Sequence, residues 1–349
     1  RARRGGPRLS KLASVRPRDA AELAAWLASR PGPVRVVGSG SRQHRVPPAP
    51  PAARTLSLGA LATIDRLDAE DHTCSVGAGL SRTELDAALA ERNVELPCLG
   101  SGTLGGLFAH DPIGATTAGG PAPRSLLLGC DAVLADGTPF RSGARVVKSV
   151  AGFDVHTLLP GSNGRLFVVT RLHLRLRPRP RVRVWFTSGA LDAQAALRRL
   201  TALRREVVPP AVLQLQRDEQ GACCVRGCFA GRATFVAERL RAHELHEGPP
   251  LADRSPQLAA GAELLTGIVL PSALPLLLAA TAPAPLVFWG GGRFEVALAP
   301  AVTDAVLPRL PSVPAHAVVT VGAPERLGRG TPVDPGHRRT EAALKQALD

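Results

Sequence analysis

Two glycine-rich loops constrain the fold of this chain more than any other feature of its sequence. The first, residues 38–42, reads Gly-Ser-Gly-Ser-Arg and follows the apolar run at residues 34–37, which predicts a short strand. The second, residues 100–106, reads Gly-Ser-Gly-Thr-Leu-Gly-Gly and precedes the apolar residues 107–109. Glycine lets backbone N–H groups approach a phosphate, and serine and arginine add donors. One such loop is commonly an ordinary turn, but a pair is harder to explain in that way.

The rest of the chain predicts two α+β units in succession. Its 349 residues are 45% hydrophobic, which is enough for a large core. The run Pro178-Arg179-Pro180 marks a boundary, because strand and helix patterns restart after it. We therefore predict a two-part unit at residues 1–180, a small α+β cap at residues 181–330 and a terminal segment at residues 331–349.

Short motifs mark several element boundaries. Asp19 is placed to cap a helix over residues 20–29, and Ser81 with Glu84 forms a capping box for the next helix. Asp136-Gly137 is a two-residue hairpin signal between apolar runs.

The charge is strongly basic, with 43 Lys+Arg against 29 Asp+Glu and a net charge of +14. In the predicted strand over residues 166–176, leucines alternate with Arg171, His173 and Arg175, so one face is cationic. A phosphate-binding stripe is one interpretation, and a half-buried strand with a solvated face is the other. Aromatic residues make up only 3% of the chain, so platforms for stacking bases are scarce and no nucleic-acid partner is expected.

Metal binding is not expected from the cysteines or histidines. The six cysteines form no paired C-x-x-C motifs, so buried, reduced thiols are the better interpretation. His243 and His246 are three residues apart on a helix predicted over residues 233–246, but no third ligand lies nearby. An exposed helical face explains them better than a metal site does.

A membrane span is not expected either. The longest uncharged stretch, residues 264–292, contains four prolines that would break a spanning helix. No apolar signal segment precedes Lys11. The sequence therefore predicts a cytoplasmic protein with at most a peripheral association with the inner membrane.

Four segments, taken together, resemble the FAD-binding domain of the vanillyl-alcohol oxidase superfamily, the PCMH-type flavoproteins. They are residues 36–41, residues 102–106 with Gly114, residues 145–154 and residues 159–170. Within that superfamily the likeness is strongest to the small FAD-binding E subunit of bacterial glycolate oxidase. A Trp-Gly-Gly…Arg element at residues 288–294 and a C-terminal helix over residues 343–349, without the tail that follows it in the family, are similar to that subunit too.

The resemblance implies that FAD lies extended, with its pyrophosphate held by backbone N–H groups of both loops. Val169 is then expected near the adenine end. Ser41 stands where relatives with histidyl-linked flavin carry His, so non-covalent FAD is expected. The cofactor-binding residues implied are Val37, Gly38, Ser39, Gly40, Ser41, Arg42, Gly102, Thr103, Leu104, Gly105, Gly106, Gly114 and Val169.

The departures from the family pattern lie where the resemblance places the catalytic groups, more than in the FAD-binding loops. Phe153 stands where the family often has Tyr, Asp111 where it often has Asn, and Arg165 where it usually has Thr. The segment at residues 120–126 is shorter than in the family and lacks a Tyr-Gly element.

Catalytic residues are the least defined part of the sequence. Arg293 is a candidate clamp for a carboxylate, or else a packing or ion-pair residue. Lys148 is a candidate to approach the flavin or a substrate carboxylate, or else a structural ion pair. No residue is identified as the base that takes the hydroxyl proton.

Three functions fit these features. The first is the FAD-binding subunit of a complex that oxidises a small 2-hydroxy acid, beside a larger FAD-containing catalytic subunit and an iron–sulfur subunit. The second is a stand-alone FAD-dependent oxidoreductase of another hydroxylated substrate. The third is a non-catalytic interaction protein that retains the fold.

Overall fold

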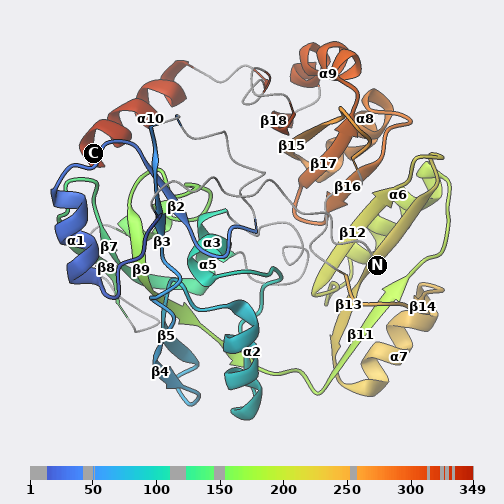
Figure 1. The fold of residues 1–349 in the computed structure, drawn as a ribbon. Coiled ribbons are helices and arrows are strands. Elements are labelled where there is room, and N and C mark those ends of the chain that lie inside the picture. The colour runs from blue at the N-terminus through green and yellow to red at the C-terminus, as the bar shows by residue number, and fades with distance from the viewer. Residues whose placement is uncertain are drawn as a thin grey trace.

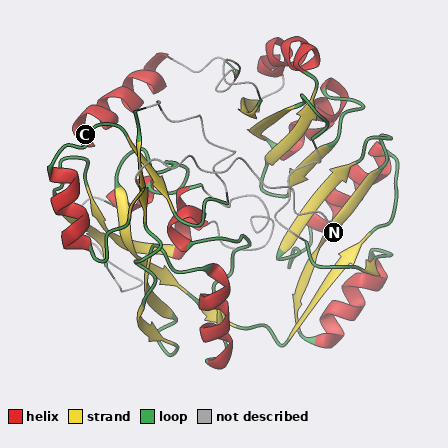
Figure 2. Cartoon of the chain, viewed as in Figure 1, coloured by secondary structure: helices red, strands yellow, loops and turns green. Residues whose placement is uncertain are grey.

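The computed structural model describes residues 14–41, 50, 52–110, 123–144, 154–251, 258–312, 315–322, 326, 330–331 and 335–348. Two groups of strands, each with its own helices, make up the chain (Figures 1 and 2). The first group ends at Pro178, and the second begins at Val182. The architecture is α+β, as predicted.

The N-terminal part contains two sheets. A parallel three-stranded sheet has the order β1-β3-β2, and an antiparallel five-stranded sheet has the order β4-β5-β9-β7-β8. The strands are β1 (Ser14–Val15), β2 (Val34–Val37), β3 (Arg54–Ser57), β4 (Ile64–Asp68), β5 (Thr73–Gly77), β7 (Leu127–Val133), β8 (Pro139–Gly143) and β9 (Val168–Arg175). The helices are α1 (Ala20–Ala28), α2 (Arg82–Glu91), α3 (Leu104–Ala109), α5 (Pro123–Leu126) and the 3₁₀ turn η2 (Val155–Leu158).

The predicted helix caps of this part are confirmed, and the predicted hairpin forms with a turn of three residues, 135–137, in place of the two expected. The Asp19 side chain accepts a hydrogen bond from the Glu22 N–H at the start of α1. Both hydrogen bonds of the Ser81 and Glu84 capping box are present at the start of α2. Gly137, in the turn between β7 and β8, has a φ of 90°, a conformation that favours glycine.

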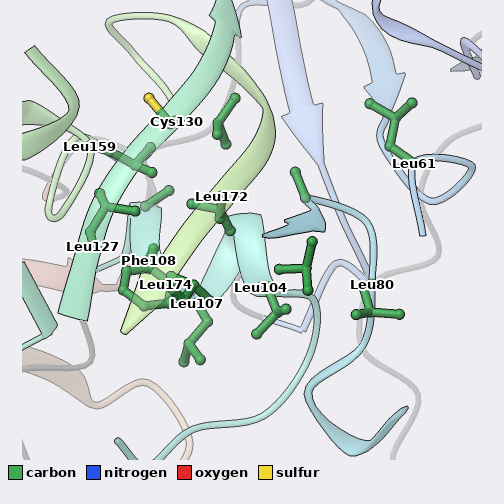
Figure 3. Packing of buried hydrophobic residues seen from close by; sticks show 14 of the residues in the cluster. Leu61, Leu80, Leu104, Leu107, Phe108, Leu127, Cys130, Leu159, Leu172 and Leu174 are labelled. Atoms are coloured by element: carbon green, nitrogen blue, oxygen red, sulfur yellow. The ribbon is translucent and has the colours of Figure 1, made fainter. Parts of the chain in front are cut away.

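Helix α3 is packed into the core of the N-terminal part (Figure 3). Its Leu104, Leu107 and Phe108 are fully buried in one cluster with Leu172 and Leu174 of β9. Burying a side chain of this size contributes about 1.5–3 kcal/mol. The second glycine loop is therefore held rigidly, because it leads directly into this helix.

The cationic face predicted for β9 is not simply solvated. β9 lies in the middle of its sheet, and His173 is buried with its Nδ1 2.9 Å from Ser75 Oγ. Arg171 forms ion pairs with Asp65 and Asp131 at 2.7 and 2.9 Å. Neighbouring strands supply these partners, which the pattern of β9 alone does not reveal.

The cap is an eight-stranded antiparallel sheet with the order β14-β11-β13-β12-β16-β17-β15-β18. Figure 1 shows its helices on the side of the sheet away from the N-terminal part. The strands are β11 (Val182–Thr187), β12 (Val212–Arg217), β13 (Cys223–Gly231), β14 (His246–Glu247), β15 (Glu263–Val269), β16 (Leu286–Trp289), β17 (Arg293–Leu298) and β18 (Ala315–Val321). The helical elements are α6 (Ala193–Arg204), α7 (Ala233–Ala242), η3 (Pro271–Ala273), α8 (Leu274–Ala280), α9 (Pro300–Val306) and η4 (Leu307–Ser312).

Several contacts among the described residues join the two parts, including the ion pair of Arg183 in β11 with Glu95 at 2.6 Å. Strand β10 (Arg177–Pro178), at the boundary, pairs with β6 (Val94–Glu95) of the N-terminal part. The terminal helix α10 (Pro335–Leu348) returns to the N-terminal part, where Lys345 Nζ donates to the Arg165 carbonyl at 3.1 Å (Figure 1). No described helix is long and apolar enough to cross a membrane.

The prediction for His243 and His246 on one helix is wrong. Helix α7 ends at Ala242, and His246 lies in β14. His243 Nε2 instead lies 2.6 Å from Glu206 Oε1. Among the described residues, no group of three or more His, Cys, Asp or Glu side chains is arranged to hold a metal ion.

Candidate functional site

The two glycine-rich loops meet at one cavity in the N-terminal part. It lies between the end of β2 and the start of α3. It is lined by Val36, Gly38, Ser39, Gly40, Ser41, Leu58, Ala78, Thr103, Gly105, Gly106, Ala109, His110, Leu159, Asn163, Gly164, Phe167, Val168 and Val169. Its lining comes mainly from three segments of the chain, at residues 36–41, 103–110 and 159–169, with Leu58 and Ala78 in addition.

The loops touch each other at Gly38 and Thr103. A Cβ atom on Gly38 would lie 1.9 Å from Thr103 Oγ1, so only glycine fits there. Gly40 differs, because its φ of 72° is left-handed and an added Cβ would meet nothing within 4 Å. Gly38 therefore allows the loops to approach, and Gly40 allows the chain to turn.

The first loop presents backbone donors to the cavity. No described residue accepts a hydrogen bond from the backbone N–H groups of Ser39, Gly40 or Ser41. Ser39 Oγ donates to Ser41 Oγ at 3.3 Å, which keeps both hydroxyls in the loop. Successive N–H groups in a turn form an anion-binding concavity. This donor set fits a phosphate or pyrophosphate group.

The second loop is fixed by strand β5. The Gly105 N–H donates to the Ala78 carbonyl at 2.8 Å. A Cβ on Gly105 would lie 2.9 Å from the Ala78 methyl and 3.0 Å from its carbonyl oxygen. Gly105 is therefore needed because α3 packs closely on the chain after β5. A Cβ atom added at this position would point toward Ala78 more than toward a ligand.

The third wall comes from residues 159–169. Asn163 adopts a left-handed φ of 54°, and its N–H donates to the Ala109 carbonyl at 2.9 Å. His110 Nδ1 lies 2.9 Å from the Gly106 carbonyl oxygen. A carbonyl oxygen only accepts, so Nδ1 carries the ring proton in this arrangement. The Asn163 bond joins the end of α3 to the turn before β9, and the His110 contact holds its ring against the end of α3.

Eight of the implied cofactor-binding residues line the cavity: Gly38, Ser39, Gly40, Ser41, Thr103, Gly105, Gly106 and Val169. Val37 and Leu104 do not, because their side chains are buried in the core. Gly102 has a φ of 83°, and its carbonyl accepts from the Arg82 N–H. Arg42 and Gly114 lie outside the described residues.

Sequence reasoning missed His110 and most of the third wall as site residues. His110, Asn163, Gly164 and Phe167 line the cavity but were not among the implied ligand-binding positions. The turn Gly161-Ser162-Asn163-Gly164 was the available signal, because three of its residues have positive φ here.

The candidate catalytic residues are not part of this cavity. Arg293 Nη2 lies 3.2 Å from Glu295 Oε1 in the cap, so the ion-pair alternative describes it better than an open clamp. Lys148 lies outside the described residues, as do Asp111 and Phe153. Burial raises the pKa of the Cys74 and Cys130 thiols to about 12, so these two cysteines of the N-terminal part stay protonated and unreactive at neutral pH.

Both glycine-rich loops lie in a segment that matches a known family. Residues 12–143 match the family model described as an FAD binding domain. This segment is a PCMH-type FAD-binding domain, and FAD is its cofactor. The donors of the first loop and the close contact of Gly38 with Thr103 both lie within the matched range. The resemblance stated from the sequence is thus confirmed.

Curated relatives share the sequence over about half of this chain. An uncharacterized FAD-linked oxidoreductase of Mycobacterium tuberculosis is 32% identical over 47% of this chain and 36% of its own length. The glycolate oxidase subunit GlcE of Escherichia coli is 28% identical over 53% of this chain and 50% of its own. A D-lactate dehydrogenase of Archaeoglobus fulgidus is 28% identical over 42% and 34%. The chain thus spans half or less of the length of these relatives.

The fold of the whole chain, cap included, is found among solved structures. An alkyldihydroxyacetonephosphate synthase matches with a TM-score of 0.69, covering 96% of this chain and 74% of that protein at 13% identity. This likeness extends the shared architecture beyond the FAD-binding domain to the cap.

Proposed function

We propose that this chain is an FAD-dependent oxidoreductase that serves as the FAD-binding subunit of a complex oxidising a small 2-hydroxy acid. The observation that carries the proposal is the cavity formed by both glycine loops within the FAD-binding domain. Support for the reaction class comes from relatives named as a glycolate oxidase subunit and a D-lactate dehydrogenase.

The residues of the cavity would hold FAD through its phosphates. The N–H groups of Ser39, Gly40 and Ser41 would bind the pyrophosphate, while Thr103 sets the spacing between the two loops. The carbonyl contacts of His110 and Asn163 fix the wall on the other side. FAD, when bound, supplies the two-electron acceptor to which a hydride from the hydroxyl-bearing carbon is transferred.

The partners in this proposal are a larger FAD-containing catalytic subunit and an iron–sulfur subunit. Subunit status is supported by the likeness to GlcE, whose name designates a subunit. We propose a cytoplasmic location with at most peripheral membrane association, for which the net charge of +14 would suit an anionic lipid face. Nucleic acid is not a proposed partner, because Arg171 of the basic strand is already paired with two carboxylates.

An anaerobic titration of the purified chain tests the proposal. The isolated chain should be yellow, and its flavin should stay oxidised when glycolate or D-lactate is added. Co-expression with the large flavoprotein and iron–sulfur subunits should restore turnover. A colourless protein that cannot be reconstituted with FAD would contradict the oxidoreductase role, and inactivity of the complete complex on 2-hydroxy acids would contradict the substrate class.

A stand-alone oxidoreductase is the second candidate, and the likeness to a D-lactate dehydrogenase favours it. Rapid bleaching of the flavin in the isolated chain by a 2-hydroxy acid would support this candidate over the subunit.

A further inference from the structure

A second cavity lies where the chain crosses from the N-terminal part into the cap. Its volume is about 220 Å³, whereas a single water molecule needs about 10–15 Å³. Helix α2 and residues 94–99 line one side, and the segment at residues 177–183 lines the other with parts of β11, β12 and β13. Figure 1 shows the chain passing α2 on its way to β11. This cavity, which we call the junction cavity, shares no described lining residue with the cavity of the glycine-rich loops.

The junction cavity carries an excess of positive charge. Four arginines line it against two carboxylates, those of Asp86 and Glu95, which leaves two positive charges uncompensated. Three of these arginines, Arg177, Arg179 and Arg183, come from the basic run around the boundary at residues 178–180. Arginine stays protonated in proteins, so this charge is present at every physiological pH.

Much of the donor capacity of these three arginines is unused. Glu95 accepts from Arg177 Nε at 2.7 Å and from Arg183 Nη2 at 2.6 Å, one bond to each carboxylate oxygen. The other guanidinium N–H groups of Arg177 and Arg183, and all those of Arg179, donate to no acceptor among the described residues. Donors from three side chains therefore converge on one cavity without an acceptor to match them.

The rest of the lining is buried and fixed in place. Leu96, Cys98, Val212 and Cys228 are all buried. Arg82 holds this wall, because its Nη1 and Nη2 donate to the carbonyls of Cys98 and Leu96 at 2.6 and 3.0 Å. A charge-assisted hydrogen bond is stronger beside such a surface than in open water, since the local dielectric constant is lower.

The free donors fit a small ligand with two negative charges. A guanidinium group is a planar fork that binds a carboxylate or a phosphate through two parallel N–H bonds. A dianion would also neutralise the excess charge of the cavity. The volume limits the ligand to a small molecule, and the half-buried ring of Trp185 offers apolar surface for a short carbon body.

We propose that the junction cavity is a second ligand site, which binds a small dianion, a phosphate compound or a dicarboxylate, through Arg177, Arg179 and Arg183. The bound dianion lies between α2 and β11 and so strengthens the attachment of the cap to the FAD-binding domain. This inference goes beyond the proposed function and does not depend on it, because the cavity and its arginines carry it alone.

The test measures binding of two probe dianions to the full FAD-loaded chain by isothermal titration calorimetry, at an ionic strength fixed with NaCl. The probes are inorganic phosphate and succinate. Bound FAD occupies the cradle of the glycine-rich loops, so the probes cannot bind there. Arg179→Gln removes the arginine that has no partner among the described residues. Arg181→Gln is its matched control, since Arg181 is an exposed arginine two positions away that does not line the cavity.

A second pair of variants adds a negative charge in place of removing a positive one. Ala90 and Ala87 are both exposed on α2, but only Ala90 lines the junction cavity. Ala90→Glu should repel a dianion, and Ala87→Glu is the control with the same change of charge. Glutamate is a good helix former, so both variants should keep the fold.

The wild type should bind at least one probe. Arg179→Gln and Ala90→Glu should weaken that binding by about tenfold or more, as expected when a charge-assisted hydrogen bond is lost or a like charge is brought near. Arg181→Gln and Ala87→Glu should bind within about twofold of the wild type. Binding of phosphate alone would assign the site to phosphate compounds, and binding of succinate alone to dicarboxylates.

Three results would overturn the inference. The first is that the wild type binds neither probe. The second is equal affinity within either pair of variants, because the probes would then be held by the positive charge of the whole surface. The third is release of FAD by the probes, which would place them in the cradle of the glycine-rich loops. Each of these results would leave the proposed function intact.

Discussion

Gly38 and Thr103 lie so close that a Cβ atom on the glycine would be 1.9 Å from the threonine Oγ1. This contact joins two loops that are far apart in the sequence and sets the width of the cavity between them. Gly38→Ala should therefore push the loops apart and weaken FAD binding by about tenfold or more, given that overpacking costs about 1–3 kcal/mol. Fluorescence titration of the apoprotein with FAD measures the change.

Gly59→Ala is the control for that substitution, because a Cβ there would meet mainly the flexible end of Arg16 at 3.3 Å. Its FAD affinity should match the wild type. Adding Thr103→Gly to the Gly38→Ala protein removes the clashing atoms and should restore part of the affinity. Equal affinity of Gly38→Ala and wild type would show that the loop contact does not shape the site.

Gly105→Val should reduce stability and FAD binding together. The new side chain would meet the Ala78 methyl and carbonyl, so α3 must move away from the end of β5. We expect a loss of about 1–3 kcal/mol in the free energy of unfolding, measured by urea titration of the apoprotein. Gly106→Ala is the neighbouring control, since its Cβ would meet only Thr103 Oγ1 at 3.2 Å. Full stability of Gly105→Val with lost FAD binding would mean that its side chain blocks the ligand directly.

Non-covalent attachment of FAD is a separate prediction, based on Ser41 at the position where histidyl-linked relatives carry His. Acid precipitation of the purified protein should release the yellow colour into the supernatant. Flavin that remains in the pellet would indicate a covalent bond.

Arg217 should be among the most sensitive positions of the cap. Its buried guanidinium donates to the carbonyls of Leu278, Thr281 and Ala284 at 2.7–2.9 Å, which satisfies the end of α8. Arg217→Met would orphan these acceptors and should cost about 3 kcal/mol or more. Arg217→Lys should recover little, because an ammonium group lacks the planar fork. Thermal unfolding measures both, and near-wild-type Tm values would contradict the role.

His156 should make stability fall as the pH drops below neutrality. Burial lowers the pKa of His156 below its ordinary value of 6.5; Asp154 opposes this shift, and Arg124 adds to it. The unfolded chain therefore binds the proton more readily than the folded protein does. The contribution of His156 to stability is present above pH 6.5 and is lost as the pH falls toward the pKa of the folded state. His156 contributes at most about 1.4 kcal/mol per pH unit to the slope of the unfolding free energy against pH.

His156→Asn isolates this effect, because an amide can still meet Ser142 Oγ, which lies 3.1 Å from the histidine Nδ1. Urea titrations between pH 5 and 7 should give a shallower pH dependence for the variant than for the wild type. Parallel curves for the two proteins would show that His156 titrates alike in the folded and unfolded states.

The features that the sequence determined by itself are those set by neighbouring residues. The Asp19 cap and the Ser81 and Glu84 capping box depend on hydrogen bonds within a few residues, and both occur as predicted. The hairpin signal at Asp136-Gly137 placed the β7–β8 hairpin, although its turn is one residue longer than predicted. The family likeness was accessible for the same reason, because its glycine loops are short contiguous motifs. Confirmation came from the matched range of residues 12–143.

Only the tertiary structure decided which distant residues meet. The Asn163 N–H donates to the Ala109 carbonyl, and Arg293 pairs with Glu295 and so is not an open clamp. Ser75 lies in hydrogen-bond contact with His173, which is 98 residues away in the sequence. In the sequence, Gln214 does not differ from other polar residues of an alternating strand. The packing of the folded chain buries its amide without a partner. The physical reason is that strand register and sheet order depend on burial summed over the whole core, and no local hydrogen bond or dihedral preference encodes that sum.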